Sequence, residues 1–182
     1  MRKIRFALIG TIAAGWLAHP YPVAAQARDI IDAGVRDALT QFNQMDRRNQ
    51  RLSGTASGIL VFPQVTKGGI ALAGEYGEGA LQVNGATIEY YSVASASVGL
   101  TAGMATHSEV ILFMTPEALQ KFLDSHGWSI GADGSVAVVA RGVSGDYDST
   151  RMKKPILVFV FGEKGLIADL SLAGTRIQKI KK

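Results

Sequence analysis

The feature that most constrains the fold is the run Ser57–Leu81, in which a short apolar stretch leads into a glycine-rich one. The apolar stretch Ile59–Phe62 ends at Pro63, and Lys67–Gly69 has the composition of a turn. The strand predicted to follow carries three glycines, Gly74, Gly77 and Gly79. A glycine weakens a strand unless another backbone passes close to it or the sheet bends there. The run therefore predicts a strand, a turn and a glycine-rich strand in a sharply curved sheet or at a barrel corner.

Two hairpins are predicted further along the chain. Asn84-Gly85 separates two strand-like runs, 76–83 and 86–93, and this dipeptide is the strongest short hairpin signal. A second tight hairpin is expected from runs 155–161 and 166–172, joined through residues 162–165. The polar stretch before it, residues 142–154, is expected to be a long loop.

Two helices are predicted. From Asp29 to Arg51, apolar residues recur every three or four positions, at Ile31, Val35, Ala38, Phe42 and Met45. This spacing is typical of an amphipathic helix that covers a core. A shorter helix should begin with Thr115 as N-cap and Pro116 in its first position, and should end before Gly127. Its expected buried residues are Leu119, Phe122 and Leu123.

Many strands with hairpin-length connections and no crossover helices argue against a parallel sheet. We therefore expect an α+β fold. Its centre should be a curved antiparallel sheet or partly closed barrel, with an N-terminal amphipathic helix packed on it and a second short helix. The sequence shows no internal repeat and no domain boundary.

The N-terminus has the pattern of a secretory signal peptide. Basic residues (Arg2, Lys3 and Arg5) precede the apolar run Phe6–Leu17, and small residues follow. We expect cleavage after Ala25 or Ala27, so that residues 1–25 are the signal peptide and residues 26–182 form a single domain. The protein is then predicted to be periplasmic or secreted. It has no cysteine to carry a lipid, and the mature chain lacks an apolar run long enough for a transmembrane helix.

Charge and motifs exclude several function classes. Loss of the three basic residues of the signal peptide lowers the formal net charge from +4 to +1, which argues against nucleic-acid binding. The glycines of GEYGEG lack the order of a nucleotide-binding loop, and RGVSGD is not a nucleophile elbow. The two histidines of the mature chain, His107 and His126, are interpreted as structural or surface residues without a carboxylate at ligand spacing. We therefore predict no enzyme activity, catalytic residue, metal or cofactor.

The remaining chemical signal is the clustering of basic residues. A basic side chain near an anionic membrane contributes about 1 kcal/mol to binding. The candidate lipid-binding residues are Lys67, Arg151, Lys153, Lys154, Arg176, Lys179, Lys181 and Lys182. The alternative interpretation of the C-terminal lysines is an ordinary solvated tail.

The order of several motifs resembles the SYLF domain family. These are GILVFP, KGG, GEYGEGAL, SVGLTAGMATHSEVILFMT, WSIGADGSVAVVARG and KGLIADLSLAGTRI, and the resemblance spans roughly Asp29 to Lys179. It implies binding of phosphoinositides or other acidic lipids in eukaryotic members, contact with actin in some, and an envelope role in bacterial ones. It implies no enzyme activity. In the run GEYG this chain has Glu75 where eukaryotic members often have a basic residue. This difference argues against specific binding of phosphoinositides.

Together these observations predict an exported, non-enzymatic domain that binds acidic phospholipid surfaces peripherally. The alternative is an envelope protein-interaction or structural module whose curved sheet receives a partner, and a hydrolase with an unrecognised site is a further one. An anionic phospholipid membrane is thus the expected partner, with a protein partner open and nucleic acid excluded.

Overall fold

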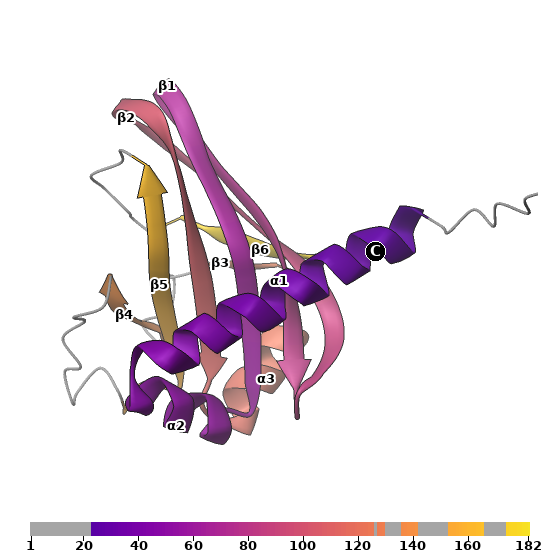
Figure 1. The fold of residues 1–182 in the computed structure, drawn as a ribbon. Coiled ribbons are helices and arrows are strands. Elements are labelled where there is room, and N and C mark those ends of the chain that lie inside the picture. The colour runs from indigo at the N-terminus through magenta and orange to yellow at the C-terminus, as the bar shows by residue number, and fades with distance from the viewer. Residues whose placement is uncertain (1–22, 126, 130–135, 142–152, 166–173) are drawn as a thin grey trace, which may run out of the picture.

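A computed structural model describes residues 23–125, 127–129, 136–141, 153–165 and 174–182 of the chain. These residues form three helices and six strands (Figure 1). In chain order they are α1 (Val23–Met45), α2 (Arg47–Thr55), β1 (Gly58–Val83), β2 (Ala86–Phe113), α3 (Pro116–Leu123), β3 (Trp128–Ser129), β4 (Val136–Arg141), β5 (Ile156–Gly165) and β6 (Arg176–Ile180).

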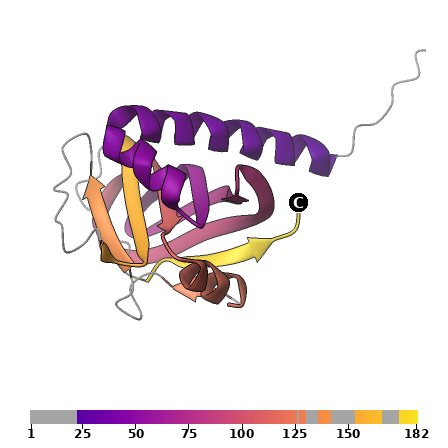
Figure 2. The ribbon, with the colours of Figure 1, turned by 90° about the horizontal axis from the view of Figure 1, so that it is seen from below.

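The strands form one curled sheet in the order β3-β6-β2-β5-β4, with β1 paired along β2. Every pairing is antiparallel except that of β4 with β5, which is parallel. Helix α1 lies across one side of the sheet and α3 lies on the other (Figure 2). The predicted α+β fold, with a curved and mainly antiparallel sheet, an N-terminal helix and a second short helix, is confirmed.

The hairpin of β1 and β2 organises the sheet. Its turn is the predicted one, because Asn84 and Gly85 both have positive φ (51° and 77°) and Val83 pairs with Ala86. The predicted turn at Lys67–Gly69 is wrong. These residues stay in β1 and pair with residues 103–105 of β2, so the ladder continues through them.

The hairpin folds back on itself. A Cβ atom at Gly77 would lie 2.9 Å from the carbonyl oxygen of Gln64, and one at Gly79 would overlap the carbonyl of Val61. The second half of β1 therefore passes directly over its first half, and the long hairpin is doubled over in Figure 1. Two of the three strand glycines thus mark the predicted close approach. Gly74 does not, because nothing lies within 4 Å of the Cβ position there.

The predicted helix from Asp29 to Arg51 is divided into α1 and α2. Asp46 is extended (φ −154°, ψ 140°) and caps α2, with its side chain accepting a hydrogen bond from the N–H of Arg48. The side-chain amide of the buried Asn49 donates to the carbonyl oxygen of Phe42 at 2.9 Å, which holds the two helices together. A strong N-cap inside a periodic apolar pattern therefore ended the helix early.

The shorter helix begins as predicted, with Thr115 accepting from the N–H of Ala118 and Pro116 in its first position. Leu119 and Phe122 are buried as expected, whereas Leu123 is 38% exposed. The predicted tight turn at residues 162–165 is wrong, because these residues continue β5 and Lys164 pairs with Thr106 of β2. The run 166–172 and residues 142–152 of the predicted loop lie outside the described residues.

Short segments of β1 (60–62), β2 (109–113) and β5 (156–161) are buried on both faces, so their side chains supply two cores. One core lies inside the curl and takes in Phe62, Ile111 and Phe122. The other lies under α1, where Phe42 packs edge-to-face on Phe159 with ring centroids 4.8 Å apart. Within the described part of the chain no helix is long and apolar enough to cross a bilayer.

Candidate functional site

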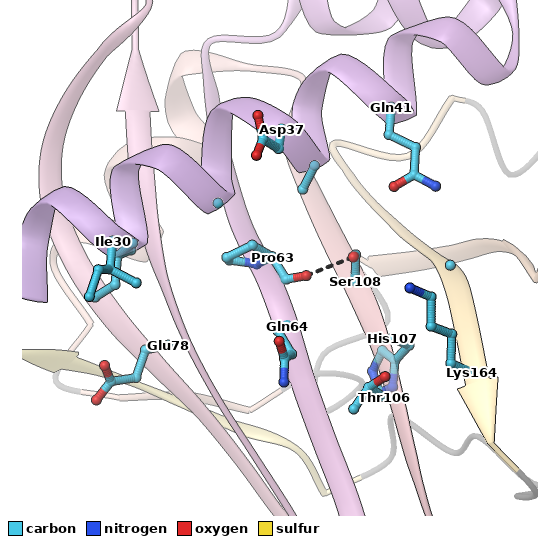
Figure 3. Close-up of a pocket in the computed structure, with 14 residues that line it drawn as sticks. Ile30, Asp37, Gln41, Pro63, Gln64, Glu78, Thr106, His107, Ser108 and Lys164 are labelled. Atoms are coloured by element: carbon cyan, nitrogen blue, oxygen red, sulfur yellow. Dashed lines mark hydrogen bonds between the residues drawn. The ribbon is translucent and has the colours of Figure 1, made fainter.

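A cavity of about 510 Å³ lies between α1 and the strands beneath it. Figure 3 shows Ile30, Asp37 and Gln41 of α1 on one side and residues of β1, β2 and β5 on the other. The strand side chains that line it are mostly polar, and include Gln64, Glu78, Thr106, His107, Ser108 and Lys164. The cavity is within the size range of small-molecule sites, but its wall carries both acidic and basic groups.

Local features of the sequence create this cavity. Pro63 has no N–H to donate, and the pairing of β1 with β2 is irregular between Phe62 and Val65. The freed carbonyl oxygen of Pro63 instead accepts a hydrogen bond of 2.8 Å from the hydroxyl of Ser108 (Figure 3). Helix α1 is fixed above by Asp32, whose carboxylate accepts hydrogen bonds from Thr87 (3.0 Å) and Tyr90 (2.9 Å).

Behind the cavity wall, three ionisable side chains meet in the interior. His107 Nε2 lies 3.0 Å from Glu109 Oε1 and 3.2 Å from Glu75 Oε1. All three are buried, with exposed fractions of 3%, 0% and 5% for His107, Glu109 and Glu75. Ser95, paired with Glu75 across the sheet, donates its hydroxyl to Glu75 Oε2 at 2.7 Å. We call Glu75, His107 and Glu109 the buried triad.

The triad joins the two halves of the folded hairpin. Glu75 lies on the second half of β1, and His107 and Glu109 lie on the second half of β2, opposite Val65 and Phe62. Since successive side chains of a strand alternate between faces, His107 and Glu109 point to the same side. The sequence-based statement that no carboxylate stands at ligand spacing from His107 is therefore wrong.

The triad shifts the pKa values of its members. Burial would lower the pKa of His107, but hydrogen bonds and charges from Glu109 and Glu75 outweigh it and raise this pKa to about 9. Burial raises the pKa of Glu109. Burial alone would also raise the pKa of Glu75. Hydrogen bonds from His107 and Ser95 and the positive charges of His107 and Lys67 outweigh burial, so this pKa is lowered overall. At neutral pH an imidazolium therefore faces an ionised Glu75.

Hydrogen bonding within the triad is incomplete. Glu109 Oε2 and Glu75 Oε1 have no hydrogen-bond partner, although Glu75 Oε1 is close to the His107 ring. One N–H of His107 faces two carboxylates and cannot donate fully to both. Buried polar atoms normally find partners, so these oxygens require an explanation.

The candidate lipid-binding residues are not gathered in one place. Lys67 is buried, with 6% of its surface exposed, so it does not lie on a surface that can meet a membrane. Lys153 and Lys154 are exposed just before β5, and Arg151 lies outside the described residues. Arg176, on β6, is also exposed.

The C-terminal lysines differ from one another. Lys179 forms an ion pair with Glu89, and Lys182 with Glu78, at 2.7 Å for the latter pair. Lys181 is exposed, and no ion pair is found for it within the described part of the chain. Two of the four basic residues after Thr175 are thus partly neutralised by the β1–β2 hairpin.

Sequence reasoning missed the buried triad. The available signal was two charged residues, His107 and Glu109, spaced two apart at the start of a strongly apolar strand segment that ends at Phe113. Glu75, in contrast, could be placed only once the doubling over of the hairpin was known.

Comparison with protein families agrees with the motif resemblance. Residues 94–182 match the family model Ysc84, described as Las17-binding protein actin regulator. The matched part includes most of β2, all of β3 to β6 and α3. No curated protein matches the chain. Ysc84 is the SYLF domain, a family of non-enzymatic lipid-binding and actin-regulating domains. Residues 94–182 of the chain therefore match the SYLF domain family, as the motifs indicated.

Proposed function

We propose that this SYLF domain is exported and binds acidic phospholipid surfaces peripherally, without enzyme activity. The observation that carries the proposal is the exposure of basic side chains in two segments, one just before β5 and the other along β6 and directly after it. These residues are Lys153, Lys154, Arg176, Lys179 and Lys181, and we call them the exposed basic set. All lie within the stretch that matches the family model.

Members of the exposed basic set should contribute unequally to the affinity for anionic membranes. Lys179 is paired with Glu89, and a solvent-exposed ion pair offsets much of the charge that a membrane would attract. Arg176 and Lys181 have no acidic partner within the described residues, so we expect them to contribute most on the β6 side. Buried Lys67 is not part of the set.

Sedimentation with lipid vesicles tests the proposal. The wild-type domain should sediment with vesicles containing phosphatidylserine and remain in solution with phosphatidylcholine alone. Because each charge contributes about 1 kcal/mol, the double variant Arg176→Glu/Lys181→Glu should bind at least about thirtyfold more weakly. Arg176 precedes the buried Ile177 and Lys181 follows β6. Because both side chains are exposed, replacing them should not disturb the core.

A matched control reverses two exposed charges elsewhere. Arg36 lies on α1 and Arg47 at the start of α2, and both are exposed. In Figure 2 these two helices lie along the top of the view and β6 lies in its lower part. The variant Arg36→Glu/Arg47→Glu has the same net charge as the test variant. It should bind as the wild type does. Equal loss in both variants would show that net charge, and not the exposed basic set, drives binding.

The second candidate is a protein-interaction module. It is favoured by the family description, Las17-binding protein, and by two exposed apolar side chains on the hairpin, Tyr76 (54%) and Met104 (69%). A wild-type domain that sediments with neither kind of vesicle would favour this module over lipid binding.

A further inference from the structure

The buried triad takes no part in the proposed binding of lipid, because its three side chains do not reach the surface. Two carboxylates and an imidazole occupy the interior of a sheet whose neighbouring positions, Ile111 and Phe113, are apolar. Burying ionised groups is costly unless each has partners, and here two carboxylate oxygens lack them. Among the described residues, Lys67 is the only other charged residue that is buried.

We propose that Glu75, His107 and Glu109 form a binding site for a divalent transition-metal ion, with Zn²⁺ as the favoured ion. Each residue offers one ligand atom, and these atoms lie within 4.8 Å of one another. Tetrahedral zinc ligands at their usual bond lengths stand about 3.3 Å apart. The separations of 3.0 and 3.2 Å from His107 Nε2 to the two carboxylates are close to this value.

The chemistry of the ligands selects the ion class. Imidazole nitrogen favours zinc and its transition-metal neighbours, while Mg²⁺ and Ca²⁺ prefer all-oxygen sites. On binding, the ion takes the place of the proton on His107 Nε2, which leaves to solvent, and Glu75 and Glu109 bind as carboxylates. The unpartnered oxygens Glu109 Oε2 and Glu75 Oε1 then have a positive charge to face.

The surroundings supply orientation and access. Ser95 holds Glu75 through its hydrogen bond of 2.7 Å to Oε2, as groups around metal ligands commonly do. His107 is the triad member that lines the cavity under α1, so the ion can reach the triad from there. An ion bound here would cross-link the two halves of the folded hairpin, in a chain that has no cysteine for a disulfide.

The test is titration of chelator-treated protein with Zn²⁺, followed by calorimetry and by thermal melting. We expect one ion per chain, a higher melting temperature with Zn²⁺, and no comparable effect of Mg²⁺. Glu75→Gln and Glu109→Gln keep the side-chain shape and should each abolish stoichiometric uptake. Glu117→Gln, an exposed residue of α3, is the matched control and should bind as the wild type does.

The variant Ser95→Ala is a second test in case the Gln variants do not fold, because it keeps all three proposed metal ligands. It should weaken Zn²⁺ affinity about 10- to 100-fold with the circular dichroism spectrum unchanged. The inference is overturned if the wild type takes up no zinc, or if the two Gln variants and Ser95→Ala bind zinc as tightly as the wild type. Vesicle binding plays no part in these readouts, so the result is independent of the proposed function.

Discussion

Single residues decide where this hairpin can fold over. Gly77 and Gly79 are the positions at which a side chain would collide with the first half of β1, while Gly74, in the same glycine-rich run, has open space around it. The sequence predicted the close approach but could not distinguish these glycines, because the segment that meets them is defined only by the folded hairpin.

Gly79→Ala should therefore destabilise the domain and Gly74→Ala should not. A Cβ at Gly79 overlaps the Val61 backbone, which cannot move as a flexible side chain can. We expect a loss of about 1–3 kcal/mol in the free energy of unfolding, measured by urea denaturation. Equal stability of the two variants would contradict the close packing of the two halves of β1.

Lys67 was predicted to contact lipid, yet it is buried and its positive charge acts on Glu75. In the proposed metal site this charge opposes cation binding. Lys67→Met should therefore tighten Zn²⁺ affinity by about tenfold, because electrostatic interactions inside a protein are weakly screened. Calorimetric titration of both proteins measures the change, and a weaker affinity in the variant would contradict the role assigned to Lys67.

At the scale of elements, the sequence predicted what depends on local signals. The Asn84-Gly85 turn and the Thr115-Pro116 helix start are confirmed because their chemistry is contained in adjacent residues. Lys67–Gly69 was predicted to be a turn from composition alone, but pairing with β2 keeps it extended. The division of the predicted helix at Asp46 is different, because the cap that ends α1 is a local signal that the apolar pattern concealed.

The junction of α1 and α2 offers a test at this scale. Asn49→Ala removes the hydrogen bond to the carbonyl oxygen of Phe42, and with it the polar contact between the two helices. We expect a loss of about 1 kcal/mol in the free energy of unfolding. Gln50→Ala, one position along and exposed, is the control and should have little effect. Urea denaturation of the two variants provides the comparison.

At the scale of the whole molecule, the fold class could be predicted from the sequence, but only part of the candidate site could. Alternating apolar strands and one amphipathic helix were enough to predict a curved sheet covered by a helix. The buried triad brings together residues 75, 107 and 109, and no local pattern connects Glu75 to the other two. Ion pairs of Lys179 and Lys182 with the hairpin were likewise beyond sequence reasoning.

Export is a prediction for the whole chain. The expected cleavage sites after Ala25 and Ala27 fall in the first turns of α1, which reach beyond the sheet in Figures 1 and 2. From residue 25 onward, where the side chains of α1 are described, the first core residue is Ile31. Mass spectrometry of the exported protein should find Gln26 or Arg28 at the N-terminus, and an intact Met1 would contradict this.

If the domain binds acidic phospholipid electrostatically and at the membrane surface, its binding should depend strongly on salt. Sedimentation of the wild-type domain with phosphatidylserine vesicles should be strong at low ionic strength. It should vanish in about 1 M salt, where the Debye length falls to about 3 Å. Binding that survives molar salt would contradict electrostatic, peripheral binding and would indicate insertion of apolar side chains into the bilayer.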